Sequence, residues 1–245
     1  MEHALSAPSA SDRSSHPDPA SLPSRTARHD IYAPIHMALR AALTDAMLAV
    51  GRLDAADIRE TTDVVARVRD LLDLCQQHLE TENALIHPAM EARRPGSTRG
   101  VAAEHVGHAA SIAHLRRQVE ALARAPAGAR EPVAVDLYRC VALFVGENLV
   151  HMHAEESAHN AVLWDAYSDD ELLALEATIK AHVPPAAMRQ ALRWMVPAMT
   201  PAQRAGMFVA MRARAPVGAY EGAIALARAH LDARAIRKLD AALAD

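Results

Sequence analysis

Apolar residues recur every three or four positions over most of the chain, which is the spacing of one face of an α-helix. This pattern predicts four long helices at about residues 30–50, 56–93, 98–125 and 132–167. The segments between them are short, and long helices joined by short connections favour an up-down antiparallel four-helix bundle. The sequence therefore predicts an all-α fold organised around such a bundle.

The chain is expected to have three parts. Residues 1–28 are rich in Ser, Pro, Ala and Asp, a composition that predicts a disordered tail. Residues 29–167 contain the predicted four-helix bundle. Residues 168–245 carry recurrent prolines, which divide this part into short helices of about 10–14 residues. We therefore expect a C-terminal helical appendage after the bundle.

Helix-capping signals mark the start of this appendage and a break within it. Ser168 is followed three residues later by Glu171, and Thr200 by Gln203, which is the spacing of a capping box. The appendage also contains five methionines and Trp194. Packing against the bundle is the expected role of these side chains, with an adaptable partner-binding surface as the alternative.

Two pairs of polar residues interrupt the apolar faces of the predicted helices. His78 and Glu82 lie on the apolar face of the second helix, and His151 and Glu155 lie on that of the fourth. A buried carboxylate without a partner is costly, so an inward carboxylate either forms an ion pair or binds a metal. The apolar stripes are expected to continue at Leu85 and Ala89 in the second helix and at Ala158 and Val162 in the fourth.

The first and third predicted helices also direct histidines inward. His36 shares a face with apolar residues of the first helix, and His105 heads the apolar stripe of the third, where His108 also faces inward. Each of the four helices therefore supplies an inward histidine. Imidazoles and carboxylates without a pair of inward thiolates suit iron or manganese, and zinc is also acceptable. The sequence predicts a metal site inside the bundle.

Other histidines and acids near these pairs are expected elsewhere. His87 comes nine residues after His78, half a turn around a regular helix, and is expected to face solvent or the following loop. In the stretch ENLVHMHAEESAH, His153 and Glu156 are expected on the solvent face. His159 is expected to support the site or to lie at the helix end.

Three residues lie one turn before predicted ligands. Asn148 precedes His151 and Tyr32 precedes His36, so both are candidates for orienting a ligand ring, although ordinary packing is the expected role. The third, Cys75, is expected to fill the core.

Composition excludes several classes of partner. The formal charge is −4 and the pI is near 6.4, which gives no reason to expect nucleic acid or a membrane surface as a partner. The two cysteines, Cys75 and Cys140, cannot form a disulfide framework, which favours a reducing cytoplasm. We expect no secretory signal and no membrane-spanning segment.

The order of the inward residues resembles that of the hemerythrin-like (HHE cation-binding) family: His36, His78 with Glu82, His105, and His151 with Glu155. The segments HLETENALIHPAMEAR and LVHMHAEESAHNAVLW are also similar to the second and fourth helices of that family. The resemblance covers about residues 30–165. It implies a four-helix bundle that holds a non-haem di-iron centre, with the four histidines as terminal ligands and the two glutamates as bridges.

The chain departs from the oxygen-carrying hemerythrins at two positions. Those proteins have two histidines four residues apart in the third helix and an aspartate in the last motif, whereas this chain has Ala109 and Glu155. Four histidines and two glutamates are more similar to bacterial iron–sulfur-cluster repair proteins and to regulatory hemerythrin-like domains. The repair proteins usually carry a cysteine-bearing N-terminal domain, which the tail of this chain does not resemble.

The resemblance implies a redox protein that binds and reacts with a small ligand such as O2, NO or H2O2, with an electron-donor protein as a candidate partner. A non-catalytic O2 or iron storage or sensing module, with residues 168–245 binding a partner, is the alternative. A ferritin-like oxidase would need two inward ExxH motifs, and only Glu156 and His159 have that spacing. A metal-free bundle is the remaining interpretation.

Overall fold

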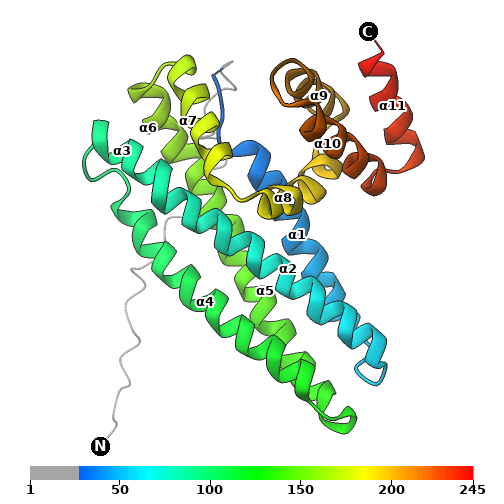
Figure 1. The fold of residues 1–245 in the computed structure, drawn as a ribbon. Helices are drawn as coiled ribbons and strands as arrows, with labels where there is room; N and C mark the ends of the chain where they lie inside the picture. The colour runs from blue at the N-terminus through cyan, green and yellow to red at the C-terminus, as the bar shows by residue number, and fades with distance from the viewer. Residues whose placement is uncertain (1–27, 245) are drawn as a thin grey trace, which may run out of the picture.

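The computed structural model describes residues 28–244, and this part of the chain is helical throughout, with no strand (Figure 1). The all-α prediction is therefore confirmed for the described residues. The predicted disordered tail at residues 1–28 lies outside them, apart from Arg28. None of the helices in residues 28–244 is long and apolar enough to cross a membrane.

The observed helices agree with the predicted ranges to within a few residues. The second and fourth predicted helices are each continuous but contain one π-helical turn. The part after the π turn is labelled separately, as α3 in the second helix and as α6 in the fourth. In chain order the elements are α1 (Ala33–Gly51), α2 (Ile58–Thr81), a π turn (Glu82–Ile86), α3 (His87–Arg93), α4 (Arg99–Arg124), a 3₁₀ turn (Ala127–Ala129), α5 (Arg130–Ala154), a π turn (Glu155–His159), α6 (Asn160–Ala166), α7 (Asp169–His182), α8 (Pro185–Ala198), α9 (Pro201–Arg214), α10 (Val217–His230) and α11 (Ala233–Leu243).

Local capping residues define where these helices begin. The Asp57 side chain accepts hydrogen bonds from two backbone N–H groups at the start of α2, which have no partner within the helix. Both predicted capping boxes are confirmed, with Ser168 and Glu171 at α7 and Thr200 and Gln203 at α9. Helices α7 and α9 consequently begin where the sequence predicts them.

The long helices enclose the main hydrophobic core. Helix α1 packs against α2 and α5, and α4 packs against the same two helices, so the four lie side by side (Figure 1). Leu43, Leu72, Leu115 and Leu137 are among the fully buried side chains that meet between them. A second apolar cluster, which includes Tyr32, closes one end: Ile31, Tyr32, Ile86, Met90, Leu163 and Leu172.

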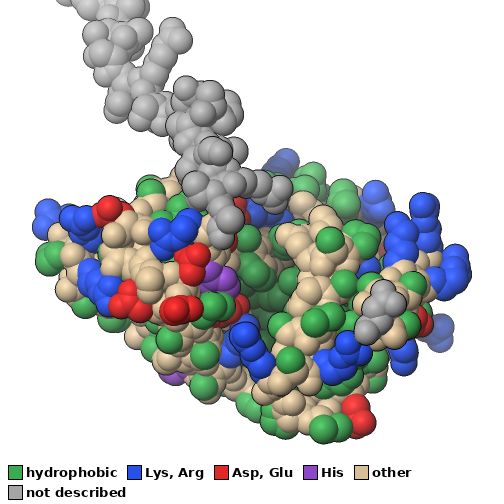
Figure 2. Space-filling view, turned by 90° about the horizontal axis from the view of Figure 1, so that it is seen from above, with side chains coloured by type: hydrophobic (Ala, Val, Ile, Leu, Met, Phe, Trp, Pro, Cys, Tyr) green, Lys and Arg blue, Asp and Glu red, His purple; other side chains and the backbone are tan. Residues whose placement is uncertain are grey.

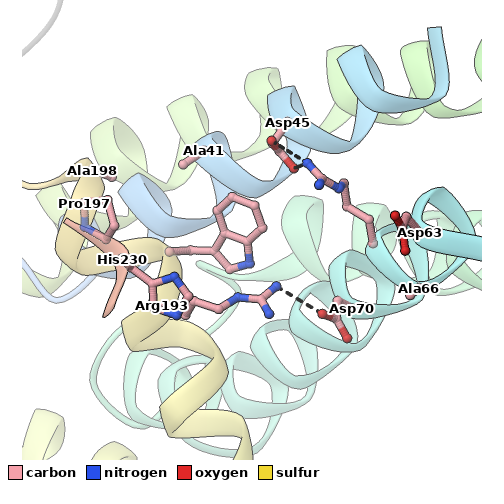
Figure 3. Close-up of a pocket in the computed structure, with 11 residues that line it drawn as sticks. Ala41, Asp45, Asp63, Ala66, Asp70, Arg193, Pro197, Ala198 and His230 are labelled. Atoms are coloured by element: carbon pink, nitrogen blue, oxygen red, sulfur yellow. Dashed lines mark hydrogen bonds and ion pairs between the residues drawn. The ribbon is translucent and has the colours of Figure 1, made fainter. Parts of the chain in front are cut away.

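Two C-terminal helices contact the earlier ones: α7 places Leu172 in the second apolar cluster, and α8 packs on α1 and α2. Arg193 of α8 forms an ion pair with Asp70 of α2 at 3.0 Å, and Gln190 donates a hydrogen bond to the backbone carbonyl of the same aspartate. Figure 3 shows the groove at this junction, where Arg193 reaches across to Asp70. Trp194 is partly buried and packs against the main core.

Helices α8, α9, α10 and α11 form a smaller cluster around Phe208, which is fully buried. Lys and Arg side chains gather on the face of the C-terminal helices seen in Figure 2. Met207 and Met211 pack against this cluster, and Met199 is buried. Met207 and Met211 therefore pack within the C-terminal helices, whereas the sequence predicts packing against the bundle.

Candidate metal centre

Histidine and glutamate side chains from all four long helices meet in a buried group between the main core and the cluster around Tyr32. On α1, His36 lies between the buried Tyr32 of one cluster and the buried Leu39 of the other. The structure brings the six predicted ligands into two groups of donor atoms that share Glu82 and Glu155. The first group is His36, His78, Glu82 and Glu155, and the second is Glu82, His105, His151 and Glu155.

The distances within these groups are too long for strong hydrogen bonds. The Nε2 atoms of His36 and His151 lie 3.3 Å from the carboxylate of Glu155, and Nε2 of His78 lies 3.3 Å from that of Glu82. Charge-assisted hydrogen bonds are shorter, about 2.7–2.9 Å. Two ligands bound to one ion at about 2.1 Å, however, lie about 3.0–3.4 Å apart.

Several donor atoms at the centre are buried without a hydrogen-bond partner. These include both carboxylate oxygens of Glu82, both of Glu155, and Nε2 of His36 and of His78. Leaving such atoms unpaired costs free energy, because they give up water and gain no partner. Within residues 28–244, this convergence of unpaired nitrogen and oxygen atoms fits a cation that would bind them.

Three of the candidate ligand histidines have their other ring nitrogen fixed by an oxygen acceptor. This arrangement sets the tautomer, since a ring that donates from Nδ1 presents the lone pair of Nε2 to the centre. The pairs are His36 with Glu156 at 3.0 Å, His105 with Asn83 at 2.8 Å and His151 with Glu104 at 2.8 Å. The rings are therefore oriented in the way that metal-binding histidines usually are.

The expectation that Glu156 lies on the solvent face is wrong. Its carboxylate is mostly buried and contacts Nδ1 of His36, and the Arg40 guanidinium binds both of its oxygens at 2.6 and 2.9 Å. Burial raises the pKa of Glu156, but His36 and Arg40 outweigh this effect and bring it down to about 2. Glu156 is therefore an anion that orients the His36 ring.

The apolar stripes do not continue as predicted after Glu82 and Glu155, because a π turn begins at each glutamate. A π turn contains one residue more than an α-helical turn and so advances the side-chain register by one position. Ile86 and Met90 are consequently buried in place of Leu85 and Ala89 in the first case. In the second, His159 and Leu163 are buried in place of Ala158 and Val162.

The same shift shows that the expectation for His87 is wrong, and it places His159 beside the centre, which is one of the two positions expected for it. His87 is buried, whereas a regular helix would turn it toward solvent. His159 is also buried, and its Nδ1 lies 3.3 Å from the Tyr32 hydroxyl. These two histidines and Glu155 form a third group of donor atoms within 4.8 Å of one another. Periodicity could not identify them, since it assumes an uninterrupted α-helix.

The pKa values of the two shared glutamates are shifted in opposite directions. Burial and the nearby carboxylate of Glu155 raise the pKa of Glu82 well above its ordinary value. Burial also acts to raise the pKa of Glu155, but the surrounding imidazoles outweigh it and hold the pKa well below the ordinary value. Burial lowers the pKa of His78 to about 3, so this ring is neutral at pH 7, which is the form that binds a metal.

A groove of about 630 Å³ lies between α4 and α5. His108 and the predicted ligand His151 are among the residues that line it, and their rings meet edge to face at 4.5 Å. Gly107 and Gly146 line its sides, and a Cβ atom at either position would meet no neighbouring atom within 4 Å. The missing side chains leave this groove open between the two helices.

The three residues one turn before ligands pack in the interior, which is the role expected for them, and none contacts its ligand ring through a hydrogen bond. Asn148 donates its side-chain hydrogen bond to the Phe144 carbonyl and is a packing residue. The Tyr32 ring packs 5.3 Å from His36, but its hydroxyl contacts His159. Cys75 is buried in the main core, as predicted.

Sequence reasoning did not identify Asn83 or Glu104. Each lies beside a predicted ligand in the chain, but the ring that it contacts belongs to a different helix, since Asn83 bonds His105 and Glu104 bonds His151. No local spacing reveals such a contact. No protein-family model, curated protein or solved structure matches the chain, so its function is inferred from the residues and their geometry.

Proposed function

We propose that the chain is a hemerythrin-like non-haem di-iron protein that binds and reacts with a small ligand such as O2, NO or H2O2. In this proposal α1, α2, α4 and α5 form the up-down antiparallel four-helix bundle of that family, and α7–α11 are its C-terminal appendage. The single observation that carries the proposal is the convergence of unpaired donor atoms from four helices on two shared carboxylates.

Each half of the proposed centre would use a different pair of histidines. His36 and His78 would bind one ion and His105 and His151 the other, while Glu82 and Glu155 would bridge them. Four imidazoles and two carboxylates suit iron, with manganese or zinc as other occupants. A di-iron pair in such a site supplies two reducing equivalents to a bound ligand and leaves positions open for it.

The remaining residues would orient the ligands and admit the reactant. Glu156, Asn83 and Glu104 accept hydrogen bonds from three ligand rings and hold them in the binding tautomer. The groove between α4 and α5 would admit a small molecule to the side of the centre that carries His151. The centre itself is buried, which restricts the reactant to small ligands.

The alternative function is non-catalytic storage or sensing of O2 or iron, with a partner bound through the C-terminal helices. One observation favours it, because α8 packs on α1 and α2, which carry His36 and His78. A change of metal or ligand at the centre would therefore act on helices that the appendage contacts directly.

The decisive experiment is metal analysis of protein purified without oxygen, followed by stopped-flow spectroscopy of the reduced form. We expect at least two irons per chain in the wild type, a large loss in His105→Ala and no loss in His114→Ala, an exposed control on the same helix. Rapid turnover of peroxide or NO supports an enzyme, whereas reversible oxygenation with slow decay supports a carrier or sensor. Equal iron in the wild type and both variants would refute the proposed centre.

A further inference from the structure

Three buried histidines lie outside the four-histidine, two-glutamate set proposed above: His108, which lines the groove between α4 and α5, and the pair His87 and His159. His87 and His159 each come after one of the shared glutamates, and each is turned inward by the π turn that begins there. A single π turn would be a local irregularity. Here both helices that carry a histidine followed four residues later by a glutamate (a HxxxE pair) have a π turn, and each π turn begins at that glutamate. Such insertions are frequently found at functional sites.

The donor atoms of His87, His159 and Glu155 lie within 4.8 Å of one another. The His87 ring stacks on His105 at 4.7 Å and meets His159 edge to face at 5.8 Å. Nε2 of His87 is buried without a hydrogen-bond partner, as are both oxygens of Glu155. A nitrogen lone pair and a carboxylate that are both buried and unpaired call for a cation between them.

His159 is held in the same manner as three of the proposed ligands. Its Nδ1 contacts the hydroxyl of Tyr32, a fully buried residue, at 3.3 Å. When Nδ1 donates to that oxygen, the lone pair of Nε2 is available to bind an ion. Tyr32 would therefore act as a positioning residue for His159, in the way that Glu156 acts for His36.

We infer that His87, His159 and Glu155 form a third cation-binding subsite beside the proposed metal pair. Two imidazoles and one carboxylate form a donor set that accepts a divalent first-row ion such as Zn²⁺ or Fe²⁺ and leaves positions open for water. The inference rests on the proposed function through Glu155, which the subsite shares with the pair. The group of donor atoms contains Glu155 and not Glu82, so this ion lies beside one of the two shared carboxylates.

The test is to count bound ions. Metal-free full-length protein is titrated with Zn²⁺, passed through a desalting column and analysed for metal per chain. We expect three ions in the wild type, two in the double variant His87→Phe, His159→Phe, and three in the exposed control His114→Phe. Phenylalanine keeps the ring shape and removes the nitrogens. The thermal unfolding of each metal-free variant checks that it is folded.

Each other count overturns a specific statement. Two ions in both the wild type and the double variant would refute the subsite and leave the proposed function standing. Three ions in both would refute the assignment of His87 and His159. Fewer than two ions in the folded double variant would show that these histidines belong to the pair itself and would also refute a separate subsite. Fewer than two ions in the wild type would refute the proposed function as well.

Tyr32→Phe provides a second test that does not depend on replacing a ligand. Calorimetric titration with Zn²⁺ should show the third ion bound about tenfold more weakly or worse, since loss of a group that orients a ligand costs this much. The affinities for the first two ions should not change. Equal weakening of all three ions, or of none, would refute the positioning role of Tyr32 and the subsite that depends on it.

Discussion

Replacing Glu82 by Gln should separate the stability of the metal-free protein from its ability to bind metal. The side chains have the same shape, but the amide cannot ionise. Burial and the charge of Glu155 raise the pKa of Glu82 well above the ordinary value of 4.5. The unfolded chain therefore releases this proton at a lower pH than the folded protein does.

This difference in pKa determines the sign of the effect. As pH rises through the window between 4.5 and the raised pKa, the unfolded state is favoured, and the free energy of unfolding of the metal-free wild type falls. Each unit of separation between the two pKa values costs about 1.4 kcal/mol. Glu82→Gln avoids this loss because its amide carries no charge, and it should be more stable at pH 7 by about 1–3 kcal/mol, the order of the desolvation penalty of a buried group.

Metal should reverse the order of stability. An ion present at about a thousand times its dissociation constant stabilises the wild type by about 4 kcal/mol. The variant lacks a ligand that both proposed ions share, so it should lose most of this gain. Without metal, the variant's advantage of about 1–3 kcal/mol should raise its melting temperature about 2–12 °C above that of the wild type. This conversion uses about 2–4 °C per kcal/mol for a chain of this size.

The assay is differential scanning calorimetry at pH 5 and pH 7, with chelator and with Zn²⁺. Glu80→Gln is the matched control, since this exposed glutamate lies two residues earlier on the same helix. If Glu82→Gln melted well below both the wild type and this control in the presence of chelator, the carboxylate would be stabilising the metal-free fold and the reasoning would fail. Equal stabilisation of the wild type and Glu82→Gln by Zn²⁺ would refute the bridging role.

Three further measurements test other parts of the site. Glu156→Gln removes the charge that orients His36 and should weaken metal binding about 10- to 100-fold in a chelator competition; an unchanged dissociation constant would contradict the orienting role. Gly146→Phe should obstruct the groove between α4 and α5 and slow the reaction of the loaded protein with NO at constant metal content, and an equal rate would exclude this path. Burial raises the pKa of the Cys75 thiol to about 12, so native protein should react with a thiol reagent only at Cys140 at pH 8, whereas two reacting thiols would show that Cys75 is accessible.

The helical architecture could be predicted because it depends on local chemistry. Apolar spacing places the long helices to within a few residues, and Ser168 and Thr200 begin α7 and α9 through side chains that bond three residues away. The same spacing places His78 and Glu82 on the inner face of the second long helix. The orientation of residues up to the glutamate of each HxxxE pair could therefore be predicted from periodicity alone.

The orientation of the residues after each of these glutamates was decided by tertiary structure. The π turns at Glu82 and Glu155 add one residue to a turn, which reverses the predicted orientation of His87 and brings His159 into contact with Tyr32. A regular period of 3.6 residues cannot anticipate an inserted residue, because it assumes an uninterrupted α-helix.

The partners of the ligand rings also depend on tertiary structure. His151 on α5 bonds Glu104 on α4, and His36 on α1 bonds Glu156 in the π turn after α5. By itself the sequence determined which helices form and which of their faces carry imidazoles and carboxylates. Only the packed chain decided which atoms meet, because the contacts that orient each ring cross between helices far apart in the sequence.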